Sequence, residues 1–226
     1  MDIKTTLDKP VTERAEEMPS YKGVKGKGVK NGAEFLESLR DGRVIYYQGE
    51  RVEDVTTHPA FKDMAHKIAE TYDKQHDPEY QDKMSFVDED GVRCSYSYAA
   101  PNTLEVLEAR KGNTEIWVND AMGMLGRLPD FVASMTVGVY DLRHELEKLN
   151  PELSKNAESY LQYARQNDLC LSHGLHDPCM DKSLRPPEDP DRCVRVVKER
   201  DDGIIVRGAR FNFVTDGGID LRELEA

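Results

Sequence analysis

An arginine stands among apolar and small residues in the segment Gly126-Arg127-Leu128-Pro129-Asp130-Phe131. A guanidinium is costly to bury without a partner, so either a neighbouring carboxylate or a bound anion must neutralise Arg127. Asp130 is close in sequence, and a helix start here would favour its negative charge through the helix dipole. The segment therefore predicts either a structural Arg127–Asp130 ion pair or a site for an anionic ligand.

A histidine lies among small residues in the segment Leu171-Ser172-His173-Gly174. Small neighbours let a planar ligand approach the backbone, and an imidazole exchanges protons near neutral pH. Two cysteines and two histidines recur here every three residues: Cys170, His173, His176 and Cys179. Asp177-Pro178 would break the helix needed to align them, and structural zinc sites usually combine two separated ligand pairs. We therefore expect a ligand-binding histidine and no metal.

The composition limits the expected partners and location. The 226 residues carry a formal net charge of -12, which argues against nucleic acid as the main partner. No apolar run approaches the ~18 residues that would span a bilayer, so no membrane partner is expected. The N-terminus has no apolar signal region, and four cysteines are too few for a disulfide framework. These features favour a cytoplasmic protein.

The elements that must position these residues follow from apolar spacing and turn signals. Apolar residues at helical spacing predict helices over residues 33–40, 57–72, 103–117, 132–149 and 153–167. Thr57 is the expected cap of the second helix, and Pro129 interrupts the apolar stretch 122–131. Alternating segments predict hairpins over residues 44–52, 83–96 and 193–213. We therefore expect an α+β chain in four parts: a flexible leader (1–30), a mostly helical domain (31–167), the opening of a β domain (168–213) and a tail (214–226).

Several stretches together resemble the 4-hydroxyphenylacetate 3-monooxygenase oxygenase family. They are residues 32–43 and 49–61, the GRxPDF segment, the SH…DPxxD segment and the final DDGIIVRGAR, in the order of that family. The similarity covers most of residues 31–210, and the motifs are specific only when taken together. The resemblance implies a helical N-terminal domain, a central β-barrel and a C-terminal helical bundle, as in acyl-CoA dehydrogenases. This chain would hold the first domain and the start of the barrel, without the bundle.

The resemblance also implies a reaction and its residues. Members of the family receive reduced FAD from a separate flavin reductase and use O2 to hydroxylate a phenol ortho to its hydroxyl group. The implied catalytic residues are Arg127 and His173, and these two with Phe131 form the phenol pocket. Both basic groups can bind the phenol oxygen and favour the more nucleophilic phenolate. The implied flavin-contacting residues are Cys179, Met180, Asp181 and Lys182.

Two residues depart from the family pattern. Phe131 stands where phenol-hydroxylating members often have tyrosine, so one hydrogen-bond donor is missing and other phenols become candidates. Lys182 replaces the usual arginine, which keeps the charge but not bidentate phosphate recognition. A related branch, the 4-hydroxybutyryl-CoA dehydratases, has cluster-ligating cysteines at the positions of Arg127 and Phe131, and this chain has none there.

The resemblance ends after Arg210, where an acidic tail follows. A barrel that stops after one hairpin would leave an unpaired strand edge and exposed apolar surface. Three hypotheses therefore remain open. The chain is the N-terminal part of an oxygenase completed by a C-terminal half or by further copies; or it is an inactive truncated remnant; or it is a non-catalytic flavin- or partner-binding module.

Overall fold

The computed structural model describes residues 26–123, 128–174, 183, 188, 194–201 and 203–208. The chain divides into two compact units, each described here by itself. The helical unit comprises residues 21–40 and 54–172, and the hairpin unit comprises residues 1–20, 41–53 and 173–226.

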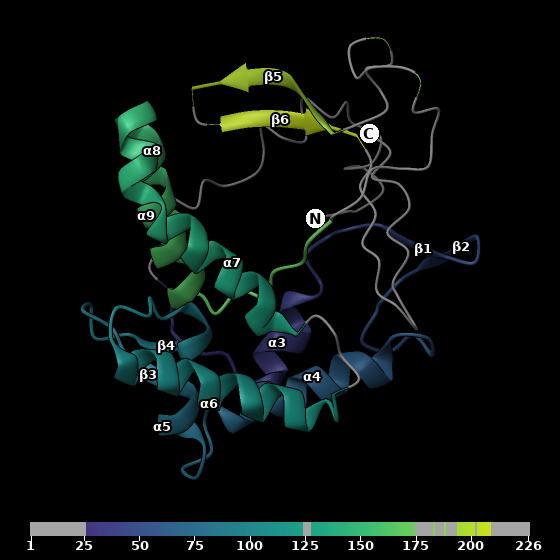
Figure 1. Cartoon of the computed structure of the whole chain (residues 1–226). Coiled ribbons are helices and arrows are strands. Elements are labelled where there is room, and N and C mark those ends of the chain that lie inside the picture. The colour runs from purple at the N-terminus through teal and green to yellow at the C-terminus, as the bar shows by residue number, and fades with distance from the viewer. Residues whose placement is uncertain are drawn as a thin grey trace. The chain divides into compact units, whose positions relative to one another are not determined.

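Helices dominate the helical unit (Figure 1). They are α3 (Gly32–Ser38), α4 (Lys62–Lys74), α5 (Gln81–Met84), α6 (Leu104–Asp120), α7 (Pro129–Asp141), α8 (Arg143–Leu149) and α9 (Pro151–Gln166). The unit also contains the antiparallel hairpin β3 (Ser85–Val87) and β4 (Arg93–Ser95), followed by the short 3-10 helix η1 (Tyr96–Tyr98). This unit is therefore mostly helical, and the hairpin expected within 83–96 is confirmed, while the domain bounds expected from the sequence stay a prediction.

The hairpin unit contains two antiparallel hairpins in its described part. One is β1 (Ile45–Tyr47) with β2 (Glu50–Val52), in which Ile45 faces Val52. The other is β5 (Arg195–Arg200) with β6 (Gly203–Arg207), with an irregular register between Val196 and Lys198. All described strands pair only within their own hairpins and form no closed barrel, so the barrel remains a prediction.

Local sequence signals explain where most helices begin. The Asn31 side chain accepts a hydrogen bond from the Glu34 amide while the Glu34 side chain accepts one from the Asn31 amide, a capping box. Thr103 caps α6 in a similar way. Pro129 and Pro151 occupy the first turns of α7 and α9, where a missing N–H costs nothing.

Two expected helix boundaries were wrong. The helix expected from Thr57 begins at Lys62 instead, because the Asp54 carboxylate accepts hydrogen bonds from both the amide and the hydroxyl of Thr56, and turns follow up to Phe61. The single helix expected over 132–149 divides at Leu142 into α7 and α8. Pro129, expected only as an interruption, begins α7.

Two apolar clusters hold the helical unit together. In the first, Phe35 stacks on Tyr72 with 4.8 Å between ring centroids, and Tyr72 meets the edge of Trp117 at 5.3 Å. The second gathers residues from η1, α7 and α9: Tyr98, Ala133, Val137, Leu161 and Ala164. Leu128 belongs to the first cluster and Ala133 to the second, so the start of α7 is held from both sides. Among the described helices, none is long and apolar enough to cross a membrane.

Candidate functional site

The first turn of α7 presents one aromatic ring to solvent. Leu128, Pro129 and Asp130 are buried, whereas Phe131 is 40% exposed. Leu128 has extended backbone angles, so the chain enters the helix directly at Pro129, and the Phe131 amide donates to the Leu128 carbonyl at 3.0 Å. The three buried residues anchor this turn in the core, and the Phe131 ring therefore projects from the surface of α7.

The buried Asp130 carboxylate has partners on α6. Burial raises its pKa, while a hydrogen bond from the Thr114 hydroxyl, the first amides of α7 and the positive charge of Arg110 act in the opposite direction. Arg127 lies outside the described residues, so the Arg127–Asp130 pair stays a prediction. Within the described residues, Thr114 and Arg110 of α6 act on the Asp130 carboxylate.

A buried carboxylate also fixes the start of the segment that leads to His173. Asp168 is 3% exposed and has a left-handed backbone with φ of 43°. Its Oδ2 atom accepts hydrogen bonds from the Lys30 amide at 3.0 Å and the Gln75 side chain at 2.7 Å. One residue later, the Leu169 carbonyl accepts a hydrogen bond from the Tyr98 hydroxyl at 2.6 Å.

His173 itself is half-buried and belongs to the hairpin unit, whereas Phe131 belongs to the helical unit. Each residue is therefore placed only within its own unit, and their convergence on one ligand remains a proposal. The anchored residues 168–171 define the point from which the chain leaves the helical unit just before His173.

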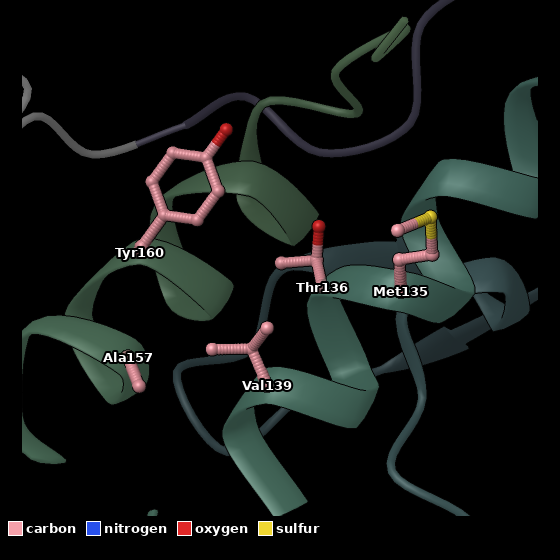
Figure 2. A pocket seen from close by; sticks show the side chains of 5 residues that line it. All are labelled: Met135, Thr136, Val139, Ala157 and Tyr160. Atoms are coloured by element: carbon pink, nitrogen blue, oxygen red, sulfur yellow. The ribbon is translucent and has the colours of Figure 1, made fainter. Parts of the chain in front are cut away.

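The four flavin-contacting residues expected from the sequence, Cys179 to Lys182, lie outside the described residues. A hollow of about 310 Å³ does occur between α7 and α9, and Figure 2 shows the side chains that line it: Met135, Thr136, Val139, Ala157 and Tyr160. These side chains are mostly apolar and offer no cationic donor for a pyrophosphate. The hollow therefore does not fit FAD, and the cofactor contact stays with the segment 179–182 as a prediction.

The cysteine and histidine series gives no metal cluster in the described part of the chain. Cys170 is exposed there, while His176 and Cys179 fall outside the description. Cys94, elsewhere in the helical unit, is fully buried, and burial raises the pKa of its thiol to about 12. Cys94 is thus part of the core and not a reactive nucleophile.

Comparison with known proteins identifies the class to which this geometry belongs. The oxygenase component of 4-hydroxyphenylacetate 3-monooxygenase from Thermus thermophilus is 36% identical over 185 residues, which cover 80% of this chain and 37% of the relative. The oxygenase component of 4-nitrophenol 2-monooxygenase from a Rhodococcus species is 36% identical over 184 residues, covering 79% and 34%. A crystal structure of a 4-hydroxyphenylacetate 3-monooxygenase oxygenase component, complexed with FAD and 4-hydroxyphenylacetate, matches with a TM-score of 0.68 and 35% identity, over 80% of this chain and 38% of that one.

The fold is therefore the one that such oxygenase components have in their N-terminal part. The model of the family described as 4-hydroxyphenylacetate 3-hydroxylase N terminal matches residues 31–217, and this chain belongs to that family. The resemblance noted from the motifs is thus confirmed, although the match continues to residue 217 and does not end after Arg210 as expected. The chain spans little more than a third of the length of the relatives it matches.

Phe131 and His173 stay predictions from the sequence, which did not indicate the residues that hold the neighbouring segments in place. Arg110, Thr114 and Asp168 bind segments far away in sequence, and only the fold brings those segments together. One local feature of the sequence does indicate the backbone of Asp168. It directly follows Asn167, the C-cap residue of α9, and residues just after a helix often adopt a left-handed backbone.

Proposed function

We propose that this chain supplies the N-terminal part of a reduced-FAD-dependent aromatic hydroxylase, which uses O2 to add a hydroxyl group ortho to that of a phenol. The observation that carries the proposal is the family match over residues 31–217, in a chain whose α7 presents an exposed aromatic ring four residues after the arginine of the family motif. The relatives named above act on 4-hydroxyphenylacetate and 4-nitrophenol, and both compounds are phenols.

Each proposed site residue has a role that its chemistry supports. The guanidinium of Arg127 donates to the phenol oxygen and stabilises its negative charge. A ring nitrogen of His173 takes the phenol proton, so that the ring carbon ortho to the oxygen becomes electron-rich. The Phe131 ring packs against the aromatic substrate and excludes water. Reduced FAD, when bound, supplies the electrons that activate O2.

Two partners follow from this proposal. A flavin reductase delivers reduced FAD, which Cys179, Met180, Asp181 and Lys182 contact, with the Lys182 ammonium as the charge for a phosphate. Relatives of this chain are more than twice as long, so residues equivalent to their C-terminal part complete the enzyme. A C-terminal half would provide them, and homo-oligomerisation is the second assembly that we propose.

Reconstitution tests the proposal. The chain is mixed with the C-terminal portion of the Thermus relative, FAD, a flavin reductase and NADH, and both O2 uptake and catechol formation from a panel of phenols are measured. We expect catechol formation, and we expect Arg127→Ala and His173→Ala each to reduce it by at least ~100-fold, the usual scale for general acid–base and electrostatic groups. His144→Ala, on the exposed surface of α8, is the matched control and should leave turnover unchanged.

The same experiment separates the alternatives. No catechol with any phenol, together with tight binding of reduced FAD, would favour a non-catalytic flavin-binding module. No catechol and no flavin binding would identify an inactive remnant. Catechol formation that survives both Arg127→Ala and His173→Ala would refute the site assignment.

A further inference from the structure

Arg110 on α6 is bonded to several elements of the helical unit at once. Its Nη1 atom donates to the carbonyls of Tyr96 at 3.3 Å, Ser97 at 2.9 Å and Ala99 at 2.5 Å. These carbonyls belong to η1 and its C-terminal end, where backbone acceptors favour a cation, and the Tyr96 carbonyl also accepts a hydrogen bond from the Ala99 amide at 3.1 Å. Arg110 thus joins α6 firmly to η1.

The other terminal nitrogen of the same guanidinium reaches α7. Arg110 Nη2 donates to the Ser134 hydroxyl at 2.8 Å, and that hydroxyl donates to the Asp130 carbonyl at 2.9 Å. Thr114 lies one helical turn after Arg110 and donates to the Asp130 carboxylate. A chain of hydrogen bonds therefore runs from α6 into the first turn of α7, which carries Phe131.

Packing on another side of α7 completes this support. Tyr98 of η1 is 1% exposed and packs with Ala133 and Val137 of α7. Because Arg110 also binds η1, one guanidinium contributes both to the hydrogen bonds and to the packing at the start of the helix. Phe131 directly follows the buried Asp130, and Arg127 lies two residues before Pro129 in the sequence.

We infer that Arg110 is a positioning residue for the phenol site, acting through Ser134 and Asp130 on the first turn of α7. The inference rests on the proposed function. It requires an arginine in particular, because two nitrogens of one planar group make the contacts to η1 and to Ser134 at the same time. A lysine has a single nitrogen and cannot bind both.

Kinetics of the reconstituted hydroxylase test the inference. Loss of the Arg110 hydrogen bonds should displace the first turn of α7, which we expect to weaken phenol binding about tenfold or more. We expect Arg110→Ala and Arg110→Lys to raise KM for the phenol by at least ~10-fold, while KM for reduced FAD stays unchanged. Adding millimolar guanidinium to Arg110→Ala should lower the raised KM part of the way back toward the wild-type value. A merely structural role would lower kcat through loss of folded enzyme and leave KM unchanged.

Ser134→Ala keeps the test valid if Arg110→Ala fails to fold, because it removes only the bond to α7 and leaves the three contacts to η1. It should raise KM for the phenol in the same direction and speed amide exchange over residues 131–135 in the full chain. Lys111→Ala is the matched control, since this neighbouring cation is 77% exposed and pairs with Glu115 at 3.6 Å.

Two results would count against the inference. If the wild-type reconstituted enzyme forms catechol and Ser134→Ala changes neither KM nor amide exchange, Arg110 does not position the site, although the proposed function stands. If the wild-type enzyme forms no catechol with any phenol, the proposed function fails and the role of Arg110 toward a phenol falls with it.

Discussion

Replacing Asp168 by alanine should remove much of the stability of the helical unit. The carboxylate accepts hydrogen bonds from the Lys30 amide and the Gln75 side chain, and Gln75 is fully buried. Loss of the acceptor leaves both donors poorly compensated, which costs about 2–4 kcal/mol in total. Alanine at a φ of 43° adds about 1 kcal/mol of backbone strain. We therefore expect Asp168→Ala to lower the free energy of unfolding by about 3–5 kcal/mol.

Asp168→Asn should behave differently, because both hydrogen bonds end on the same oxygen, Oδ2. The asparagine oxygen can accept both donors, and asparagine tolerates a left-handed backbone well. We expect this variant to be within about 1 kcal/mol of the wild type at low pH.

The stabilities of the wild type and of Asp168→Asn should depend differently on pH. Burial raises the pKa of Asp168, opposed by the hydrogen bonds from Gln75 and Lys30. The folded state therefore binds the proton more tightly than the unfolded state, whose pKa is about 3.9. The stability contributed by this group is fully present below about pH 3.9 and is lost as pH rises through the folded pKa. Asp168→Asn removes this loss, so its stability relative to the wild type should increase as pH rises from about 4.

Urea unfolding followed by circular dichroism between pH 4 and pH 8 measures these differences. Glu108→Gln, which neutralises an exposed carboxylate on α6, controls for the change in net charge and should show no such trend. The reasoning is refuted if Asp168→Ala unfolds at the same urea concentration as the wild type, or if the advantage of Asp168→Asn shrinks as pH rises.

Further predictions concern the core, two glycines and the substrate. Tyr98→Phe removes the 2.6 Å hydrogen bond to a backbone carbonyl and should cost about 1–2 kcal/mol in urea unfolding; an unchanged midpoint would contradict this bond. Gly112→Ala places a methyl group in open space inside α6 and should stabilise the helical unit by about 0.5–1 kcal/mol. Gly32→Ala would place its Cβ atom 2.6 Å from a backbone oxygen and should destabilise the unit. Equal effects of the two variants on urea unfolding would be inconsistent with the packing of α3. Because Cys94 is buried and its pKa is raised to about 12, iodoacetamide at pH 8 should label it only in denaturant, which peptide mass spectrometry detects; labelling in the native chain would disprove its burial. Phe131→Tyr restores a phenolic donor and should lower KM for 4-hydroxyphenylacetate about tenfold in the reconstituted enzyme, and no change would mean that the ring does not contact the phenol.

Apolar spacing and proline placement predicted most helices, because these signals are local. The helix expected over 103–117 is α6, which ends only three residues later than expected. The break expected at Asn150-Pro151 is also observed, between α8 and α9. Thr57 misled the prediction because capping residues also stabilise turns, and here Asp54 binds the residue before it. Local signals therefore identify an element more reliably than its first residue.

The candidate site was predictable only in part. Phe131 was proposed because it lies in a recognisable motif, whereas no motif in the sequence singles out Arg110. The Asp168–Lys30 hydrogen bond joins residues 138 positions apart, and the Asp168–Gln75 bond joins residues 93 apart. No spacing rule within the sequence brings such partners together, because the contacts depend on how the ends of α4 and α9 pack with the segment before α3.

The origin and position of the new oxygen atom test the central proposal most directly. The reconstituted enzyme is supplied with a phenol, reduced FAD and ¹⁸O2, and the product is analysed by mass spectrometry and NMR. The account predicts a catechol that carries one ¹⁸O atom on the carbon next to the original hydroxyl group, and at least ~100-fold less of it when Arg127 or His173 is replaced by alanine. A product without the label, or with the label at another ring position, would contradict it.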